Sequence, residues 1–143
     1  MLKIAFTVEG EPIPKGRPRF TRQQGRRAYT PDRTKNYEMQ VGFAAKAAMR
    51  GHRPTSLPVH VSIKAFFPIP KSAKKAEREA AAKEQLWHCG KCDSDNVFKS
   101  IADGAIGIVY DDDKQICEMA CTKMYSDHPR VEVDIWELEG ASR

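Results

Sequence analysis

The sequence predicts a single small α/β (α+β) domain in which a mixed β-sheet packs against helices. Segments with the two-residue hydrophobic alternation of half-buried strands are interspersed with segments that have the spacing of amphipathic helices. At 143 residues, of which 41% are hydrophobic, the chain can form one domain with a substantial core but is shorter than two independent domains usually need. We therefore expect residues 1–143 to form one domain.

The N-terminal half is predicted to contain a strand, a loop, a helix and a second strand. Residues 2–8 alternate between large apolar side chains and smaller or polar ones, which indicates a strand. Residues 11–19 contain three prolines and a glycine, which favour an extended loop that continues toward a hairpin through Gly25. Helical spacing follows from about residue 32 to residue 49. Residues 59–67 alternate again and indicate the clearest strand of the sequence.

The C-terminal half is predicted to contain two helices followed by two strands. Residues 72–87 are rich in alanine, lysine and glutamate but have a thin apolar stripe, which is typical of a solvated surface helix. Asp95 is expected to cap the next helix, which ends near Gly104. Residues 116–125 and 131–138 are interpreted as two strands of an antiparallel hairpin.

Basic and acidic side chains are separated along the chain. The net charge of +5, from 24 lysines and arginines against 19 acidic residues, permits a polyanionic partner without requiring one. Acids gather at residues 93–95 and 111–113, whereas a basic loop precedes the first helix. Such a loop is either merely solvated or contacts DNA phosphates, which supplies affinity but little sequence information. The residues expected to contact DNA are Lys15, Arg17, Arg19, Arg22, Arg26, Arg27 and Lys35.

Carboxylates from two separate segments are the candidate metal ligands. Hydrolysis of a phosphodiester places divalent cations against the phosphate, and hard oxygen ligands suit Mg²⁺ and Mn²⁺. Asp93 and Asp95 enter a helix and Asp113 precedes a strand, so the helix between them can bring the acids together. Lys99 lies one turn after Asp95 and could steady the attacking water or the phosphate charge. Each acidic pattern alone is more often a helix cap or a solvated turn.

Four motifs follow one another over most of the chain: Lys15-Gly-Arg-Pro-Arg-Phe20, Tyr29-Thr-Pro-Asp-Arg-Thr-Lys-Asn-Tyr-Glu38, Asp93-Ser-Asp-Asn-Val-Phe-Lys99 and Asp112-Asp-Lys-Gln-Ile116. In this order they resemble the RusA family of Holliday-junction resolvases. The combination of the two acidic motifs, with their intervening length, is much more specific than either motif alone.

The resemblance implies a homodimeric endodeoxyribonuclease that binds branched, four-way DNA junctions and resolves them by paired symmetric nicks. It implies Mg²⁺ as the cofactor, with Mn²⁺ as a substitute, and a role in DNA recombination, repair or phage DNA processing. A two-fold dimer would present two sites to a substrate of similar symmetry. Carried over by position, Asp93, Asp95 and Asp113 are the metal-binding carboxylates, Asp112 assists them, and Lys99 is the catalytic lysine.

The cysteines support a competing interpretation. Cys89 and Cys92 have zinc-knuckle spacing, and Cys117 and Cys121 could form a second pair. In a strand, however, Cys117 and Cys121 would be roughly 13 Å apart, too far for one tetrahedral ion without a bend. Cys92 also stands where many members of the family have proline. If Cys89 and Cys92, with His88, bind zinc, the protein would be a zinc-knuckle DNA-binding module. A catalytically inactive junction-binding protein is a further alternative.

The sequence also gives an expectation about location. No stretch approaches the roughly 20 apolar residues that span a bilayer, and the N-terminus does not have the pattern of a signal peptide. We therefore expect a cytoplasmic protein with reduced thiols and no membrane partner. No small-molecule cofactor is expected beyond the metal.

Overall fold

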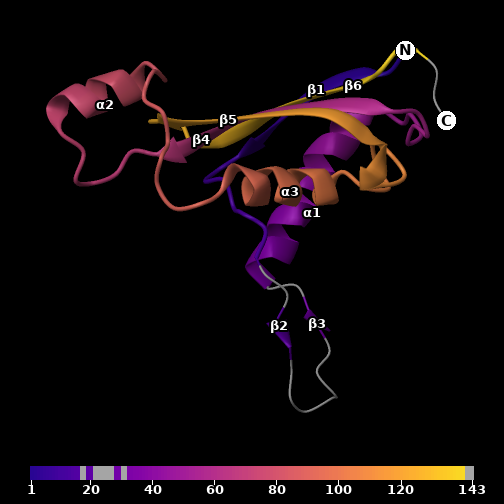
Figure 1. The fold of residues 1–143 in the computed structure, drawn as a ribbon, viewed down its shortest axis with the longest axis horizontal. Coiled ribbons are helices and arrows are strands. Elements are labelled where there is room, and N and C mark those ends of the chain that lie inside the picture. Colours follow the sequence, from indigo (N-terminus) through magenta and orange to yellow (C-terminus); the bar gives the residue numbers. More distant parts are fainter. Residues whose placement is uncertain (17–18, 21–27, 30–31, 141–143) are drawn as a thin grey trace.

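The computed structural model describes residues 1–16, 19–20, 28–29 and 32–140. A four-stranded sheet with two helices on one of its faces forms the framework (Figure 1). Its strands stand in the order β1-β6-β4-β5, and β4 and β5 are its parallel pair. This mixed sheet packed against helices confirms the predicted fold class. The four strands are β1 (Lys3–Glu9), β4 (Val59–Pro68), β5 (Ile116–Ser126) and β6 (Arg130–Glu137).

Alternating burial explains why the sheet has one face against the helices. In β1 the side chains of Ile4, Phe6 and Val8 are buried while their neighbours are exposed. The facing residues of β6 are also apolar, since Ile4 pairs with Ile135 and Phe6 pairs with Val133. The predicted strands at residues 2–8 and 59–67 are therefore confirmed, with small shifts at their ends.

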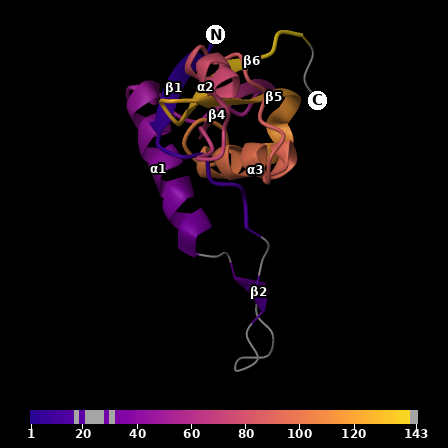
Figure 2. The ribbon, with the colours of Figure 1, turned by 90° about the vertical axis from the view of Figure 1, so that its left-hand side faces the viewer.

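Helices α1 (Asp32–Met49) and α3 (Ser94–Gly104) lie side by side against the same face of the sheet (Figures 1 and 2). The α1 bounds are those predicted, and its inward face includes Tyr37, Val41 and Ala45. Gly104 allows a close approach between the two helices, because a Cβ atom there would lie 2.7 Å from the Cβ atom of Val41. This contact places the start of α3 relative to α1.

Helix α2 (Lys75–Ala82) is the predicted surface helix, although it is shorter than expected. Ala81 is the buried residue of the helix, in agreement with its thin apolar stripe. The prediction extended to Trp87, but the backbone of residues 86–88 instead bonds to the outer edge of β5. The amide of Tyr125 donates to the carbonyl of Leu86, and this pairing requires an extended backbone. No helix within the described ranges has the length and apolarity to span a membrane.

The predicted antiparallel hairpin of residues 116–125 and 131–138 is wrong. Both strands exist, but β4 lies between β5 and β6 and pairs with each of them. The link at residues 127–129 therefore passes over the end of β4. Strand β4 is almost continuously buried, which suits a central position with neighbours on both edges.

A second, two-stranded sheet lies beyond the N-terminal end of α1 (Figures 1 and 2). It pairs β2 (Arg19–Phe20) with β3 (Ala28–Tyr29) in antiparallel fashion, as expected for a hairpin in this part of the chain. Four of the arginines predicted to contact DNA lie outside the described residues: Arg17, Arg22, Arg26 and Arg27.

Candidate active site

The start of α3 carries two of the predicted acidic residues. Asp93 occupies the N-cap position with an extended backbone, and its carbonyl accepts from the amide of Val97 at 3.1 Å. The expectation that Asp95 caps the helix is therefore wrong, because Asp95 already lies in the first helical turn. The Asp93 carboxylate accepts from Asn96 Nδ2 at 3.4 Å. Both carboxylates are exposed at a helix N-terminus, where the backbone dipole favours negative charge.

The acidic turn leads into the short 3-10 helix η1 (Asp113–Gln115). Asp112 caps it, since the Asp112 carboxylate accepts from the amide of Lys114 at 3.0 Å. This hydrogen bond is the main reason why the pKa of Asp112 lies below its ordinary value. The side chain of Gln115 completes the cap by accepting from the amide of Asp112 at 2.9 Å. Asp112 is thus engaged in holding η1, whereas Asp113 is the first residue within it.

Gln115 also fixes η1 to the loop that follows α1. Its Nε2 atom donates to the carbonyl oxygens of Thr55 and Leu57, at 2.8 and 3.0 Å. The amide of Thr55 in turn donates to the carbonyl of Val109 at 2.9 Å. These bonds give Asp113 a defined position although it lies outside the sheet.

Asp95, Lys99 and Asp113 line one hollow of about 290 Å³. The other residues that line it are Phe98, Ala102, Ile116 and Met119. Lys99 Nζ lies 3.8 Å from Asp113 Oδ2. The structure therefore brings together residues from the two acidic motifs, as the sequence predicted. Asp93 and Asp112 are not among the residues that line this hollow.

An ion-pair network beside the hollow was not predicted. Lys15 Nζ lies 3.0 Å from Asp103 Oδ2 and 3.0 Å from Glu38 Oε2. Lys99 Nζ lies 3.5 Å from the other oxygen of Asp103. Burial by itself would lower the pKa of Lys15, but hydrogen bonds to Glu38 and Asp103 raise it above its ordinary value. Asp103 stands four residues after Lys99, and this spacing is the one sequence signal that could have identified it.

The acids that line the hollow fit a hard divalent cation. Among the described residues, no three His, Cys, Asp or Glu side chains gather closely enough to hold an ion. Magnesium, however, is commonly held by one or two carboxylates together with water and substrate phosphate oxygens. Asp95 and Asp113 supply two such carboxylates at one hollow.

In the part of the chain that the structure describes, the cysteines do not gather into the zinc site of the competing interpretation. Cys117 is exposed on the edge strand β5, and burial raises the pKa of the Cys92 and Cys121 thiols, which disfavours the thiolate that binds zinc. The ring of His88 stacks on Phe67 with ring centroids 3.8 Å apart. His88 is thus a packing residue that contacts Phe67 of β4 and Tyr125 of β5.

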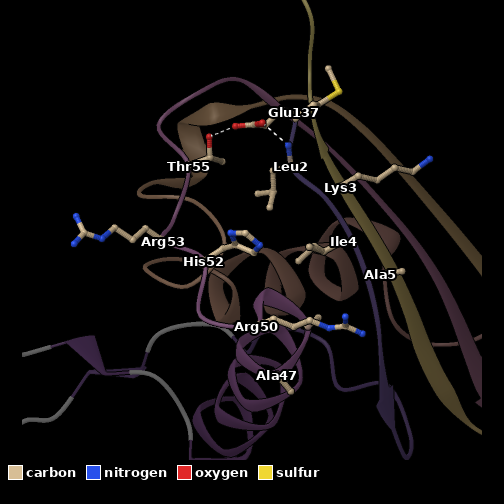
Figure 3. Close-up of a pocket in the computed structure, with 12 residues that line it drawn as sticks. Leu2, Lys3, Ile4, Ala5, Ala47, Arg50, His52, Arg53, Thr55 and Glu137 are labelled. Atoms are coloured by element: carbon tan, nitrogen blue, oxygen red, sulfur yellow. Dashed lines mark hydrogen bonds between the residues drawn. The ribbon is translucent and has the colours of Figure 1, made fainter.

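A larger hollow of about 740 Å³ lies between the start of β1 and the end of α1 (Figure 3). Glu137 is the acid among its described lining residues, and its carboxylate accepts from the amide of Leu2 and from Thr55 Oγ1, at 2.5 and 2.6 Å. These bonds hold the pKa of Glu137 below its ordinary value. The remaining charged side chains are cationic, including Arg50 and Arg53. This hollow therefore lacks the paired carboxylates that distinguish the smaller one.

Known proteins are similar to this chain over most of its length. The family model described as Endodeoxyribonuclease RusA matches residues 9–136, which include both acidic motifs and the basic loop. The uncharacterized protein YqaN of Bacillus subtilis (strain 168) is 36% identical over 141 residues, which cover 94% of this chain and 96% of that protein. The similarity thus extends over almost the whole of both chains.

Proposed function

Since the chain belongs to the RusA family of endodeoxyribonucleases, we propose that it resolves four-way DNA junctions by paired symmetric nicks in a Mg²⁺-dependent reaction, with Mn²⁺ as a substitute. Membership of the family makes the chain a hydrolase of DNA phosphodiester bonds that acts on branched junctions. The observation that carries the finer proposal is the placement of Asp95, Lys99 and Asp113 around one hollow.

Asp95 and Asp113 are the central metal-binding residues in this proposal, and Asp93 is the third. Asp93 lies two residues before Asp95, at the exposed start of the same helix. Asp112 assists indirectly, because its carboxylate caps the short helix that carries Asp113. A bound Mg²⁺ would polarise the scissile phosphate and generate hydroxide from water at neutral pH.

Lys99 is proposed to act on the phosphate itself. Its ammonium group lies 3.8 Å from Asp113 at the hollow, and its side chain is 53% exposed, so DNA can approach it. A cation at this point stabilises the negative charge that develops on the phosphate oxygens in the transition state. It can also donate a hydrogen bond to the water that attacks the phosphorus.

The basic loop and the start of α1 are proposed to contact the DNA backbone. Lys35 is exposed in the first turns of α1, and the loop contributes Arg17, Arg19, Arg22, Arg26 and Arg27. Support for this role comes from the density of cations in the sequence and from the position of β2 and β3 beyond α1 (Figure 1). Lys15 also belongs to the loop, but its ammonium group is already paired with two carboxylates.

We further propose that residues 1–143 form one domain that acts as a homodimer. A four-way junction has approximate two-fold symmetry, and two active sites related by a two-fold axis could nick opposed strands in one binding event. The expected cellular location is the cytoplasm, where recombining bacterial or phage DNA would be found.

The proposal can be tested with a supercoiled plasmid that extrudes a cruciform. Paired nicks across the junction convert this plasmid to a linear form, whereas a single nick gives an open circle. With Mg²⁺ the parent protein is expected to give mainly linear product, and without a divalent cation it should give none. A plasmid without the inverted repeat is the substrate control.

Asp95→Asn and Asp113→Asn are expected to lower the cleavage rate at least about a hundred-fold while junction binding is retained. Asp111→Asn is the matched control, because Asp111 is an exposed acid of the same turn and does not line the hollow. Parental cleavage by Asp113→Asn, or equal loss in Asp111→Asn, would contradict the assigned ligands. Mainly open-circular product from the parent protein would contradict paired nicking.

A further inference from the structure

One carboxylate beside the hollow lies between two lysines. Asp103 Oδ2 lies 3.0 Å from Lys15 Nζ, and Asp103 Oδ1 lies 3.5 Å from Lys99 Nζ. The Asp103 side chain is 16% exposed, so it is more enclosed than the Lys99 side chain that it meets. Asp103 does not line the hollow and is not one of the proposed metal ligands. Its position at the junction of the two lysines therefore calls for a separate explanation.

Lys15 is a fixed cation because its surroundings hold it at several points. Its amide donates to the carbonyl of Asn96 at 2.8 Å, which fastens the chain to the first turn of α3. The next amide, that of Gly16, donates to Thr34 Oγ1 at 3.0 Å and fastens the chain to α1. The Lys15 ammonium group donates to both carboxylate oxygens of Glu38, at 3.1 and 3.0 Å. Asp103 is thus braced from one side.

Lys99, in contrast, has a long and exposed side chain with two acidic neighbours. The ammonium group lies 3.5 Å from Asp103 and 3.8 Å from Asp113. A close ion pair with Asp113 would occupy the carboxylate that is proposed to hold the metal. A second carboxylate, held in place on the same helix, offers the ammonium group an alternative partner.

We propose that Asp103 is a positioning residue: braced by Lys15 and Glu38, it holds the Lys99 ammonium group at the hollow and keeps it from capturing the carboxylate of Asp113. The inference rests on the proposed function, because it presupposes that Lys99 acts on the phosphate and Asp113 on the metal. It also assigns to Lys15 a role inside the protein.

The test compares Asp103→Asn with Glu38→Gln. Each variant removes one carboxylate partner of Lys15, but Asp103 alone of the two contacts Lys99. Asp103→Asn is expected to lower kcat on a saturating junction about ten-fold with little change in KM. Glu38→Gln weakens the brace but leaves the contacts of Asp103 with Lys15 and Lys99 in place, so its loss of kcat should be clearly smaller. Asp103→Glu should restore part of the lost kcat. Equal effects of Asp103→Asn and Glu38→Gln would mean that Asp103 serves only to pair with Lys15, and they would overturn the proposal.

A double-mutant cycle with Lys99→Met supplies a second readout that does not depend on cleavage. Binding of Mn²⁺, measured by calorimetry without DNA, is expected to weaken in Asp103→Asn because the released ammonium group pairs with Asp113. In the Lys99→Met background the same substitution should leave the Mn²⁺ affinity unchanged. An unchanged effect in that background would overturn the proposal. A parent protein that binds Mn²⁺ but does not cut junctions would contradict the proposed function, while the Mn²⁺ cycle would still decide the role of Asp103.

Discussion

Substitution of Gly104 by alanine is expected to force α1 and α3 apart. A Cβ atom at this position would lie 2.7 Å from Val41 Cβ, 2.8 Å from Val41 Cγ1 and 2.9 Å from the carbonyl oxygen of Glu38. None of these three atoms is the end of a flexible side chain, since one is backbone and two belong to a β-branched residue. The contacts can therefore be relieved only if one helix moves against the other.

The size of the effect follows from two opposing contributions. Overpacking of this kind costs about 1–3 kcal/mol, while alanine is preferred over glycine within a helix by up to about 1 kcal/mol. The second contribution is reduced because Gly104 is the last residue of α3. We therefore expect Gly104→Ala to lower the free energy of unfolding by about 2 kcal/mol.

Gly42→Ala is a matched substitution in the opposite helix. A Cβ atom at Gly42 would meet Ile108 Cδ1 at 3.1 Å and the carbonyl oxygen of Gly104 at 3.4 Å. The closer atom is a side-chain end that can shift, and Gly42 lies in the middle of α1, where alanine is favoured. Gly42→Ala is thus expected to be neutral or stabilising by up to about 0.5–1 kcal/mol.

These differences can be measured by urea unfolding of the parent and both variants. If the dependence of the unfolding free energy on urea concentration has the same slope in all three proteins, the shift of the midpoint concentration gives the difference in stability. Gly104→Ala should also cleave junctions more slowly, because the displaced α3 carries Asp95 and Lys99. If Gly104→Ala proved as stable as Gly42→Ala, the close approach of the helices would not limit their packing and the reasoning would be refuted.

Three further predictions concern other contacts. Gln115→Ala removes the bonds to Thr55 and Leu57 and the Gln115 part of the η1 cap. It is expected to lower the free energy of unfolding in urea by about 1–2 kcal/mol and to slow cleavage. Unchanged stability would contradict this role. Hydrogen bonds from Arg130 and Ser126 lower the pKa of Glu84 from its ordinary 4.5, so the carboxylate stabilises the fold fully above that pH and progressively less as the pH falls through the shifted pKa. The difference in thermal midpoint between the parent and Glu84→Gln should therefore be largest near neutral pH and shrink under acid, and a constant difference would count against the ion pair. Cys92→Ser is expected to cleave at the parental rate, and loss of activity together with loss of bound zinc would restore the zinc interpretation.

The sequence predicted correctly those helices and strands that are determined by the spacing of apolar residues within the element itself. The bounds of α1 and the burial of β4 agree with the spacing of their apolar residues. The hairpin prediction failed because a short link is compatible with neighbouring strands and also with strands that flank a third. The position of β4 between β5 and β6 depends on packing across the whole sheet, which no local pattern reports.

The same distinction applies to the candidate site. Asp95, Lys99 and Asp113 lie within one short stretch of sequence, so helical spacing and the family motifs were sufficient to group them. Lys15 is predicted from the sequence to contact DNA phosphates as part of the basic loop, because charge density says nothing about individual partners. Its pairing with Glu38 and Asp103 joins three distant segments and arises only when α1 and α3 pack together.

The position of β5 has a consequence for how activity responds to stress. The segment that carries Asp95 and Asp113 connects β4 to β5, and β5 is an edge strand whose described outer partner is the short stretch at residues 86–88. Edge elements open by local fluctuations that leave the rest of a protein folded, and such openings are detected by amide hydrogen exchange. Detachment of β5 would free one end of the site while β1, β6 and β4 remain paired. If the proposed site is the catalytic one, we therefore expect cleavage activity to be lost in mild denaturant before the protein unfolds, because one strand at the edge of the sheet then limits resistance to inactivation.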